Sequence, residues 1–410
     1  MPAKRDHTST DTFDVLVAGG GVAGLVAAWR AAQAGRSVCL CDSGALGAGA
    51  SYVAAGMLAP VTEADPREPA LLELGLEAAQ RWPGFAEELE AVTGQGVALR
   101  RTGSLVVARA RDEAEALDRV REVAVGLGVE MERLLPSAAR RLEPALAPTV
   151  RLALHAPDDH SVDPRLVTTA LADAARRAGA VLRPGEEVAE MVADGPRASG
   201  LRLVSGERLA ATDTVLALGA GAGELPGLPA GARVPLRPVK GQLLRLRDPE
   251  GPGLLQRTVR FEGGYLVPRA DGRYVLGATQ EERGFDTAIT AGGMYELLRD
   301  ASELVPGVLE LEIEEAIAGL RPATPDNAPV LGRPDGVDGL IWAGGHHRNG
   351  ILLAPVTGDA VLRALDGESA APPFAPARFT RTREEALSPR SGRASASERF
   401  LTAVCEVSEQ

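Results

Sequence analysis

The chain of 410 residues is long enough for two domains that each bury a hydrophobic core. Hydrophobic residues make up 45% and charged residues 24%, which is ordinary for a globular protein. The formal net charge of −12 argues against nucleic acids and anionic membranes as partners, because both select positive surfaces.

Residues 14–42 predict a strand, a glycine turn, a helix and a second strand. Gly19, Gly21 and Gly24 have the spacing of a dinucleotide-binding turn. The first permits a tight turn, the second lets the backbone approach a pyrophosphate, and the third lets the helix pack on the strand. Asp42 lies 18 residues after Gly24 and is placed to bind the adenosine ribose. The pattern predicts a dinucleotide site and leaves NAD and FAD open.

Helical and extended patterns then alternate along the first half of the chain. We expect helices at 68–92, 111–127, 136–141 and 163–179, two short strands within 96–109, and strands at 180–182 and 188–189. Asp163 and Pro164 form a plausible N-cap and first helical residue.

A second buried strand at 214–221 ends in small residues, so we expect its carboxyl end at the same ligand as the first strand. The alternating pattern of 233–280 predicts antiparallel strands, with a hairpin at 265–277. A helix at 291–304, a strand at 340–343 and a helix at 352–365 follow.

This order of elements predicts an α/β fold with a Rossmann-like dinucleotide-binding domain built from separated segments and a second, α+β domain around an antiparallel β-sheet. The first domain is expected to comprise residues 10–90, 151–222 and 316–370, and the second, substrate-binding domain residues 91–150 and 223–315. Residues 371–410 are rich in Pro, Ser and Arg, which predicts a mobile C-terminal tail.

The amino-terminal residues and the cysteines indicate a cytoplasmic protein. The first ten residues are polar, and no apolar run approaches the roughly 18 residues that a membrane helix needs. Cys39 and Cys41 alternate along one face of the second predicted strand, where we expect buried, reduced thiols. We therefore expect no membrane partner and no metal site.

A second chemical block occupies residues 318–357. A glycine-flanked loop, residues 344–351, leads into the last apolar helix and would point N–H groups at a group that carries or develops negative charge. In a flavoenzyme that group is the N1–C2=O edge of the isoalloxazine.

Together, six sequence blocks resemble the D-amino-acid oxidase family of flavoproteins, and within it the glycine oxidases of bacterial thiamine biosynthesis. The blocks are residues 50–60, 238–242, 265–269, 277–281, 319–326 and 345–357. The resemblance implies non-covalent FAD and oxidation of a small amino acid to its imine, with oxygen reduced to hydrogen peroxide. It also implies a homo-oligomer, a tetramer in the family, and hand-over of the imine to a thiazole synthase.

The resemblance also assigns residues to the cofactor. Those implied to bind FAD are Gly19, Gly21, Val22, Ala23, Gly24, Asp42, Ser43, Ala50, Ser51, Ala55, Gly56, Met57, Val188, His346, His347, Arg348, Asn349, Gly350, Ile351 and Leu352. In related sarcosine oxidases a cysteine holds the flavin covalently, and Gly319 occupies that place here. Covalent attachment by that route is therefore excluded.

At the substrate, the resemblance implies that Arg321 grips the carboxylate in a bidentate manner, that Tyr265 adds a hydroxyl, and that Arg348 lies nearby. Met57 and Gln280 are expected to line the pocket. Read alone, these residues leave simpler roles open: an interdomain ion pair, a core aromatic and a loop-orienting arginine. His346 and His347 are expected to stabilise their loop and not to act as acid–base catalysts.

The residue at position 280 leaves the substrate open, because a well-studied member of the family has an apolar methionine there and this chain has a polar glutamine. Glycine is the leading substrate, with sarcosine and small D-amino acids as alternatives. A dehydrogenase that uses another electron acceptor and a non-catalytic flavin-binding subunit are the competing functions.

Overall fold

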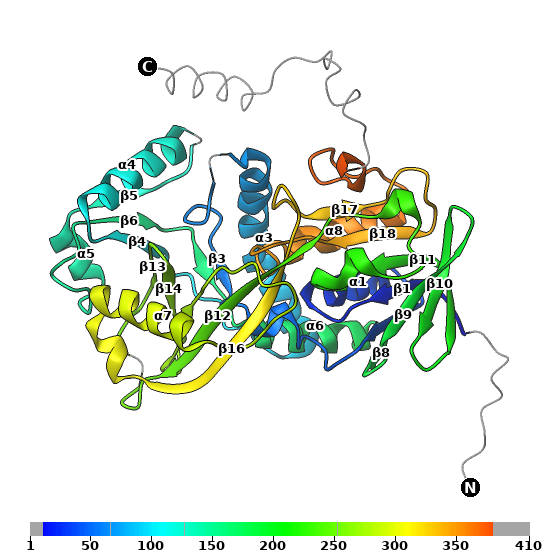
Figure 1. Cartoon of the computed structure of the whole chain (residues 1–410), viewed down its shortest axis with the longest axis horizontal. Coiled ribbons are helices and arrows are strands. Elements are labelled where there is room, and N and C mark those ends of the chain that lie inside the picture. Colours follow the sequence, from blue (N-terminus) through cyan, green and yellow to red (C-terminus); the bar gives the residue numbers. More distant parts are fainter. Residues whose placement is uncertain (1–10, 66, 127, 252, 380–410) are drawn as a thin grey trace, which may run out of the picture.

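The computed structural model describes residues 11–379 except 66, 127 and 252. Figure 1 shows two sheet-and-helix regions side by side, with two long strands, β12 and β16, running between them. Each region contains one eight-stranded sheet. The predicted α/β fold, with a Rossmann-like part and a second antiparallel part, is confirmed.

The first sheet is built on parallel strands whose carboxyl ends meet at one edge. Its path is β17 (Val330–Gly332), β18 (Leu340–Gly344), β11 (Arg208–Leu216), β1 (Asp11–Ala18), β2 (Val38–Asp42) and β8 (Val181–Pro184), with β9 (Val188–Asp194) and β10 (Arg197–Leu203) attached beside β11. Strands β18, β11, β1, β2 and β8 pair in parallel. This arrangement places the glycine turn after β1 beside the end of β11.

Three helices cover one face of this sheet: α1 (Val22–Gln33), α6 (Pro164–Arg177) and α8 (Ala354–Leu365). Helix α3 (Pro69–Thr93) packs on α6 and α8 and adds residues to the same core. Because strand residues alternate, Val15 and Val17 enter this core while Leu16 enters the core on the opposite face. As predicted, Asp163 is the N-cap of α6, and its side chain accepts a hydrogen bond from the Arg165 N–H at 3.0 Å. Cys39 and Cys41 are buried in the opposite core, also as predicted.

The second sheet is mainly antiparallel. Its order is β16 (Glu312–Ala323), β12 (Arg237–Arg247), β15 (Arg273–Gly277), β14 (Gly264–Pro268), β13 (Thr258–Phe261), β4 (Ser104–Ala108), β6 (Leu152–Ala156) and β5 (Glu132–Leu134). Helices α4 (Arg111–Gly126), α5 (Pro136–Leu142) and α7 (Ala291–Leu304) lie against it. The predicted hairpin is present as β14 and β15.

Short elements complete the fold: α2 (Ala50–Val53), β3 (Met57–Leu58), β7 (His160–Ser161) and the 3-10 turns η1 (Gly219–Glu224), η2 (Ala230–Ala232), η3 (Pro306–Glu310) and η4 (Pro376–Phe379). Strands β3 and β7 pair with each other. None of the helices in the described part of the chain combines the length and apolar character needed to cross a membrane.

The structure differs from the sequence-based expectations at four places. Only β4 forms within 96–109, because Arg100 makes an isolated bridge with Ser161 instead of joining a hairpin. Strand β6 and all of β16 belong to the second sheet, although the predicted boundaries put 151–156 and 316–323 in the first domain.

The predicted tail also begins too early. Phe374 is buried and its carbonyl accepts a hydrogen bond from the Leu331 N–H at 2.9 Å. Arg378 pairs with Asp326 at 2.8 Å. Residues 371–379 therefore pack on the first sheet, and the rest of the predicted tail lies outside the described residues.

Two helical glycines offer a matched test of the turn after β1. A Cβ at Gly24 would lie 1.8 Å from the Gly19 carbonyl oxygen, whereas a Cβ at Gly84 in α3 would meet nothing within 4 Å. We expect Gly24→Val to lower the free energy of unfolding by roughly 3 kcal/mol, because backbone must move. Gly84→Ala should raise it by about 0.5–1 kcal/mol through helix propensity. Urea unfolding of both variants measures this, and equal stabilities would contradict the packing role of Gly24.

Candidate active site

A cleft of about 1710 Å³ runs along the carboxyl ends of the first sheet and reaches the second sheet. Gly19 and Asp42, at the ends of β1 and β2, line one end, and Tyr265 and Arg321 of the second sheet line the other. The cleft therefore joins the two parts of the site that the sequence predicted separately.

The glycine turn has the geometry expected for phosphate binding. Gly19 has φ +105°, and a Cβ there would lie 2.4 Å from the Ala217 carbonyl oxygen. Gly21 is the N-cap of α1 and faces the cleft without a side chain. The Val22 N–H donates to the Ser51 hydroxyl at 3.0 Å, and the N-terminus of α1 presents its positive end to the cleft, as an anionic pyrophosphate requires.

Asp42 has a structural task that the sequence did not reveal. One carboxylate oxygen accepts a hydrogen bond from the Gly20 N–H at 2.6 Å and the other from the Gly44 N–H at 2.8 Å. Because a carboxylate has about four lone-pair sites, Asp42 can hold both turns and still accept ribose hydroxyls.

Most of the residues predicted from the resemblance line this one cleft. They are Gly19, Gly21, Val22, Ala23, Asp42, Ser43, Ala50, Ser51, Ala55, Gly56, Met57, Val188, Tyr265, Gln280, Arg321, His346, His347, Arg348, Gly350 and Ile351. Three predicted cofactor residues, Gly24, Asn349 and Leu352, are not among the lining residues. Gly24 packs against the turn, and the Leu352 carbonyl accepts a hydrogen bond from Trp82 Nε1 at 2.8 Å.

Two buried arginines donate hydrogen bonds to main-chain carbonyls of the segment from Ala50 to Met57. Arg269 is only 4% exposed and donates to the Ala55 carbonyl at 2.6 Å and to the Val162 carbonyl at 2.8 Å. Burial lowers the pKa of Arg269 to about 10, so it is charged at neutral pH. Arg245 donates to the Tyr52 carbonyl at 2.9 Å. The sequence predicted no role for either arginine, although Arg269 belongs to the block 265–269.

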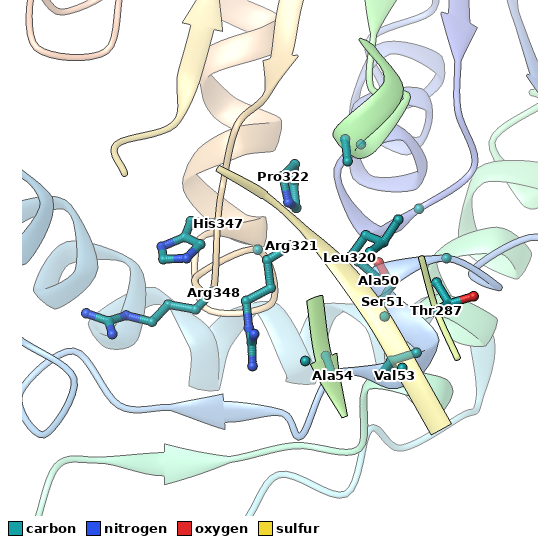
Figure 2. Close-up of a pocket in the computed structure, with 18 of the residues that line it drawn as sticks. Ala50, Ser51, Val53, Ala54, Thr287, Leu320, Arg321, Pro322, His347 and Arg348 are labelled. Atoms are coloured by element: carbon teal, nitrogen blue, oxygen red, sulfur yellow. The ribbon is translucent and has the colours of Figure 1, made fainter. Parts of the chain in front are cut away.

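Arg321 extends from β16 into the cleft, as Figure 2 shows. Its guanidinium donates to the carbonyls of Thr279 at 3.1 Å and Lys240 at 3.3 Å. Gly241 leaves room for it, since a Cβ there would lie 2.5 Å from both terminal nitrogens. Over the residues that the structure describes, Arg321 forms no ion pair, so the simpler role of an interdomain ion pair does not apply.

Tyr265 lies on β14, opposite Gly277 of β15. A Cβ at Gly277 would lie 2.6 Å from the Tyr265 hydroxyl, so glycine makes space for the ring. Burial raises the pKa of Tyr265, while the neighbouring Arg321 acts in the opposite direction. The phenol therefore stays protonated at neutral pH and can donate a hydrogen bond.

Arg348 lines the cleft but is not turned toward Arg321. Figure 2 shows its side chain running from the loop beside His347 and away from Arg321. Its guanidinium donates to the Glu63 carbonyl at 3.0 Å. The Glu63 carboxylate in turn lies 3.4 Å from Arg260 Nη2. Glu63 and Arg260 both line the cleft and were missed, because they meet only in the folded chain.

The two adjacent histidines are neutral at neutral pH. Burial lowers the pKa of His346 to about 4, and its Nε2 lies 2.9 Å from the Thr357 hydroxyl. Burial first, and then the charges of Arg348 and Arg321, lower the pKa of His347 to about 3. Both therefore fit structural roles in the loop.

The donor set fits an adenine dinucleotide flavin better than a metal. In the part of the chain that the structure describes, no group of three or more His, Cys, Asp or Glu side chains could hold a metal ion. The cleft instead combines a helix N-terminus, an acid at the end of β2, and a glycine-rich loop before α8. Fold and site together define a protein that binds an adenine dinucleotide.

The comparison with known proteins identifies the family. Residues 14–364 match the model of the DAO family, described as FAD dependent oxidoreductase, and the chain belongs to this family. Glycine oxidase of Geobacillus kaustophilus is 36% identical over 375 residues, which cover 91% of this chain and 98% of that protein. The crystal structure of glycine oxidase from that species has a TM-score of 0.84 at 36% identity, covering 90% of this chain and 99% of the other.

Two further relatives have names other than glycine oxidase. The bifunctional protein ThiO/ThiG of Synechocystis is 35% identical over 379 residues, which cover 90% of this chain and 55% of that protein. The hydrogen cyanide synthase subunit HcnC of Pseudomonas aeruginosa is 30% identical over 405 residues, covering 90% of this chain and 96% of the relative.

The neutral state of His347 predicts a pH dependence of stability. An unfolded histidine titrates near 6.5 and the folded one near 3, so the unfolded chain binds the extra proton as the pH falls. The stability that the neutral ring contributes is complete above pH 6.5 and is lost progressively below it. His347→Asn, which tolerates the positive φ of 47°, removes this loss.

We therefore expect the stability of the variant relative to the unmodified protein to improve by about 2 kcal/mol between pH 7.5 and pH 5. Urea unfolding at several pH values measures it. A difference between the two proteins that does not change with pH would show that His347 is not held neutral.

Proposed function

We propose that the protein is a glycine oxidase that oxidises glycine to its imine and reduces oxygen to hydrogen peroxide. The observation that carries the proposal is Arg321, a cation without an acidic partner among the described residues, beside the Tyr265 hydroxyl at one end of the flavin cleft. The similarity to glycine oxidases over most of the chain supports the choice of substrate.

In this proposal Arg321 binds the substrate carboxylate with two parallel hydrogen bonds, and Tyr265 donates a third. Anchoring the carboxylate orients Cα toward the flavin end of the cleft and excludes water. The chemistry that FAD supplies when bound is acceptance of two electrons at flavin N5. The substrate amine must be neutral so that its lone pair assists departure of the hydride, and this chemistry does not require a catalytic triad.

The cofactor residues are proposed by their position along the cleft. Gly19, Gly21, Val22 and Ala23 would lie at the pyrophosphate, Asp42 and Ser43 at the ribose, Val188 at the adenine, and Ala50, Ser51, Ala55, Gly56 and Met57 along the path to the isoalloxazine. Within His346 to Ile351, the N–H groups of Arg348, Gly350 and Ile351 would hold its pyrimidine end, because those of His347 and Asn349 are donated to the Pro322 and His346 carbonyls. FAD would be bound non-covalently, since Gly319 offers no side chain for attachment.

Gln280 and Met57 are the proposed determinants of substrate size, because both line the cleft. A polar glutamine leaves sarcosine and small D-amino acids, such as D-alanine, as further substrates. Arg348 is proposed to close the substrate end through Glu63 and not to bind the carboxylate directly, because its guanidinium is directed to the Glu63 carbonyl.

A thiazole synthase is the proposed recipient of the imine, and the relative named ThiO/ThiG supports this link. A homotetramer, cytoplasmic location and the two-domain division remain predictions from the sequence and its resemblance. The relative named as a subunit of hydrogen cyanide synthase supports the competing function of a flavin-binding subunit of a larger complex.

The first experiment is a peroxide assay in air with glycine, sarcosine, D-alanine and D-proline. We expect peroxide from the purified yellow protein, with glycine among the best substrates. Activity with a dye acceptor but no peroxide would assign a dehydrogenase. Failure of every amine to reduce the bound flavin without oxygen would assign a non-catalytic subunit.

Substitution of Arg321 tests the carboxylate site. We expect Arg321→Ala to raise KM for glycine by about 100-fold or more while FAD stays bound, because the anion loses its charged partner. Arg321→Lys should give a KM between those of the unmodified protein and Arg321→Ala, because an ammonium cannot form the two parallel hydrogen bonds of a guanidinium. Steady-state kinetics and flavin absorbance measure both effects.

The control is Arg202→Ala, which removes an ion pair with Glu190 on the surface of the first sheet and should leave KM unchanged. Loss of flavin from Arg321→Ala with an unchanged KM would contradict the assigned role.

A further inference from the structure

Lys240 is a fully buried lysine that the proposed function does not use. It lies on β12 and is 1% exposed. Its ammonium donates to Asp286 at 2.8 Å and lies 3.8 Å from the Glu281 carboxylate. Because removal of an ammonium from water is costly even when it is paired, an apolar side chain would suit the interior at least as well. The charge at this position therefore calls for an explanation beyond packing.

Both acidic partners belong to the segment 278–290, which connects β15 to α7. Lys240 and Glu281 also exchange two backbone hydrogen bonds, at 2.9 and 3.0 Å. Gln242, two residues further along β12, donates to the Glu281 carboxylate at 2.7 Å and accepts from the Thr290 N–H at 2.8 Å. The segment 278–290 is thus bonded to β12 along its length, and Lys240 supplies the positive charge of its ion pairs with Asp286 and Glu281.

The same segment lines the cleft through residues that include Thr279, Gln280 and Thr287. Figure 2 shows Thr287 across the pocket from His347 and Arg348. The guanidinium of Arg321 rests on the carbonyls of Thr279 and Lys240, one from each of the two pieces that the lysine joins. A shift of the segment relative to β12 would therefore change the direction of Arg321.

We propose that Lys240 is a positioning residue for the substrate carboxylate. Its ammonium holds the segment 278–290 against β12 so that the Thr279 carbonyl fixes Arg321 in the cleft. This inference rests on the proposed function, because it takes Arg321 as the carboxylate ligand. A positioning role differs from a purely structural one in what the loss of Lys240 changes. It predicts that the protein still folds and binds flavin but has a lower affinity for the substrate carboxylate.

The test uses the FAD-loaded protein and two variants that break the same ion pair from its two sides. Lys240→Met keeps the length of the side chain and removes the charge. Asp286→Ala removes one of the two acidic partners at a half-exposed position, and Lys240 keeps Glu281 as the other, so folding should tolerate the change. The matched control is Arg247→Met, which removes an ion pair with Glu314 between the same strands β12 and β16, at the end remote from Arg321.

The probe is glycolate, which keeps the carboxylate of glycine and replaces its amine by a hydroxyl. Its Kd is measured from the perturbation of flavin absorbance, and anaerobic reduction by glycine gives the substrate Kd and the limiting rate separately. We expect Lys240→Met to raise both Kd values about tenfold, with a smaller effect on the limiting rate. Asp286→Ala should raise them about threefold, and Arg247→Met less than about twofold. The double variant should bind no more weakly than Lys240→Met alone.

Unchanged Kd values in the flavin-loaded Lys240→Met and Asp286→Ala proteins would overturn the inference. If Lys240→Met does not fold, Asp286→Ala decides by itself. Failure of the proposed function has a different signature, since the unmodified protein would then bind glycolate but not be reduced by glycine, sarcosine or D-alanine. An unmodified protein that does not bind glycolate at all would overturn both.

Discussion

The site depends on a single arginine that is held without an acidic partner in the described chain. Arg321 is oriented by two main-chain carbonyls, which accept its N–H groups but do not neutralise its charge. A guanidinium in this position can bind the carboxylate of a ligand, whereas an acidic partner within the protein would occupy the same N–H donors. The pairing of β12 with β16, which sets Val239 opposite Arg321, is what brings this residue to the cleft.

The two ends of the cleft use different physical means to bind charge. The glycine turn and the N-terminus of α1 present backbone dipoles to a phosphate. The far end presents the side chains of Arg321 and Tyr265, and burial, with smaller contributions from the charges of Arg348 and Arg321, keeps His347 neutral. One cleft can thus hold an anionic cofactor and orient an anionic substrate, because the two groups of donors are separated along its length.

Local rules account for what the sequence predicted well. The roles of Gly19 and Gly24 follow from steric limits within a few residues, and the start of α6 follows from Asp163 and Pro164. The Cys39 and Cys41 pattern identified a buried strand because alternation is a property of one strand. These features could be read without knowledge of the rest of the chain.

Features that depend on distant segments could not be predicted in the same way. Strand β6 joins the second sheet by pairing with β4, which lies more than forty residues earlier in the chain. The pair of Glu63 with Arg260, and the hold of Arg269 on the Ala55 carbonyl, join segments that have no common pattern. Arg348 was placed near the substrate by resemblance, but its direction depends on the position of Glu63.

The most direct test of the account is a crystal structure of the FAD-loaded protein with bound glycolate. We expect the glycolate carboxylate to accept hydrogen bonds from both Arg321 and Tyr265, with the α-carbon of glycolate facing the isoalloxazine. A carboxylate bound elsewhere, or an isoalloxazine at a distance from Arg321, would contradict it.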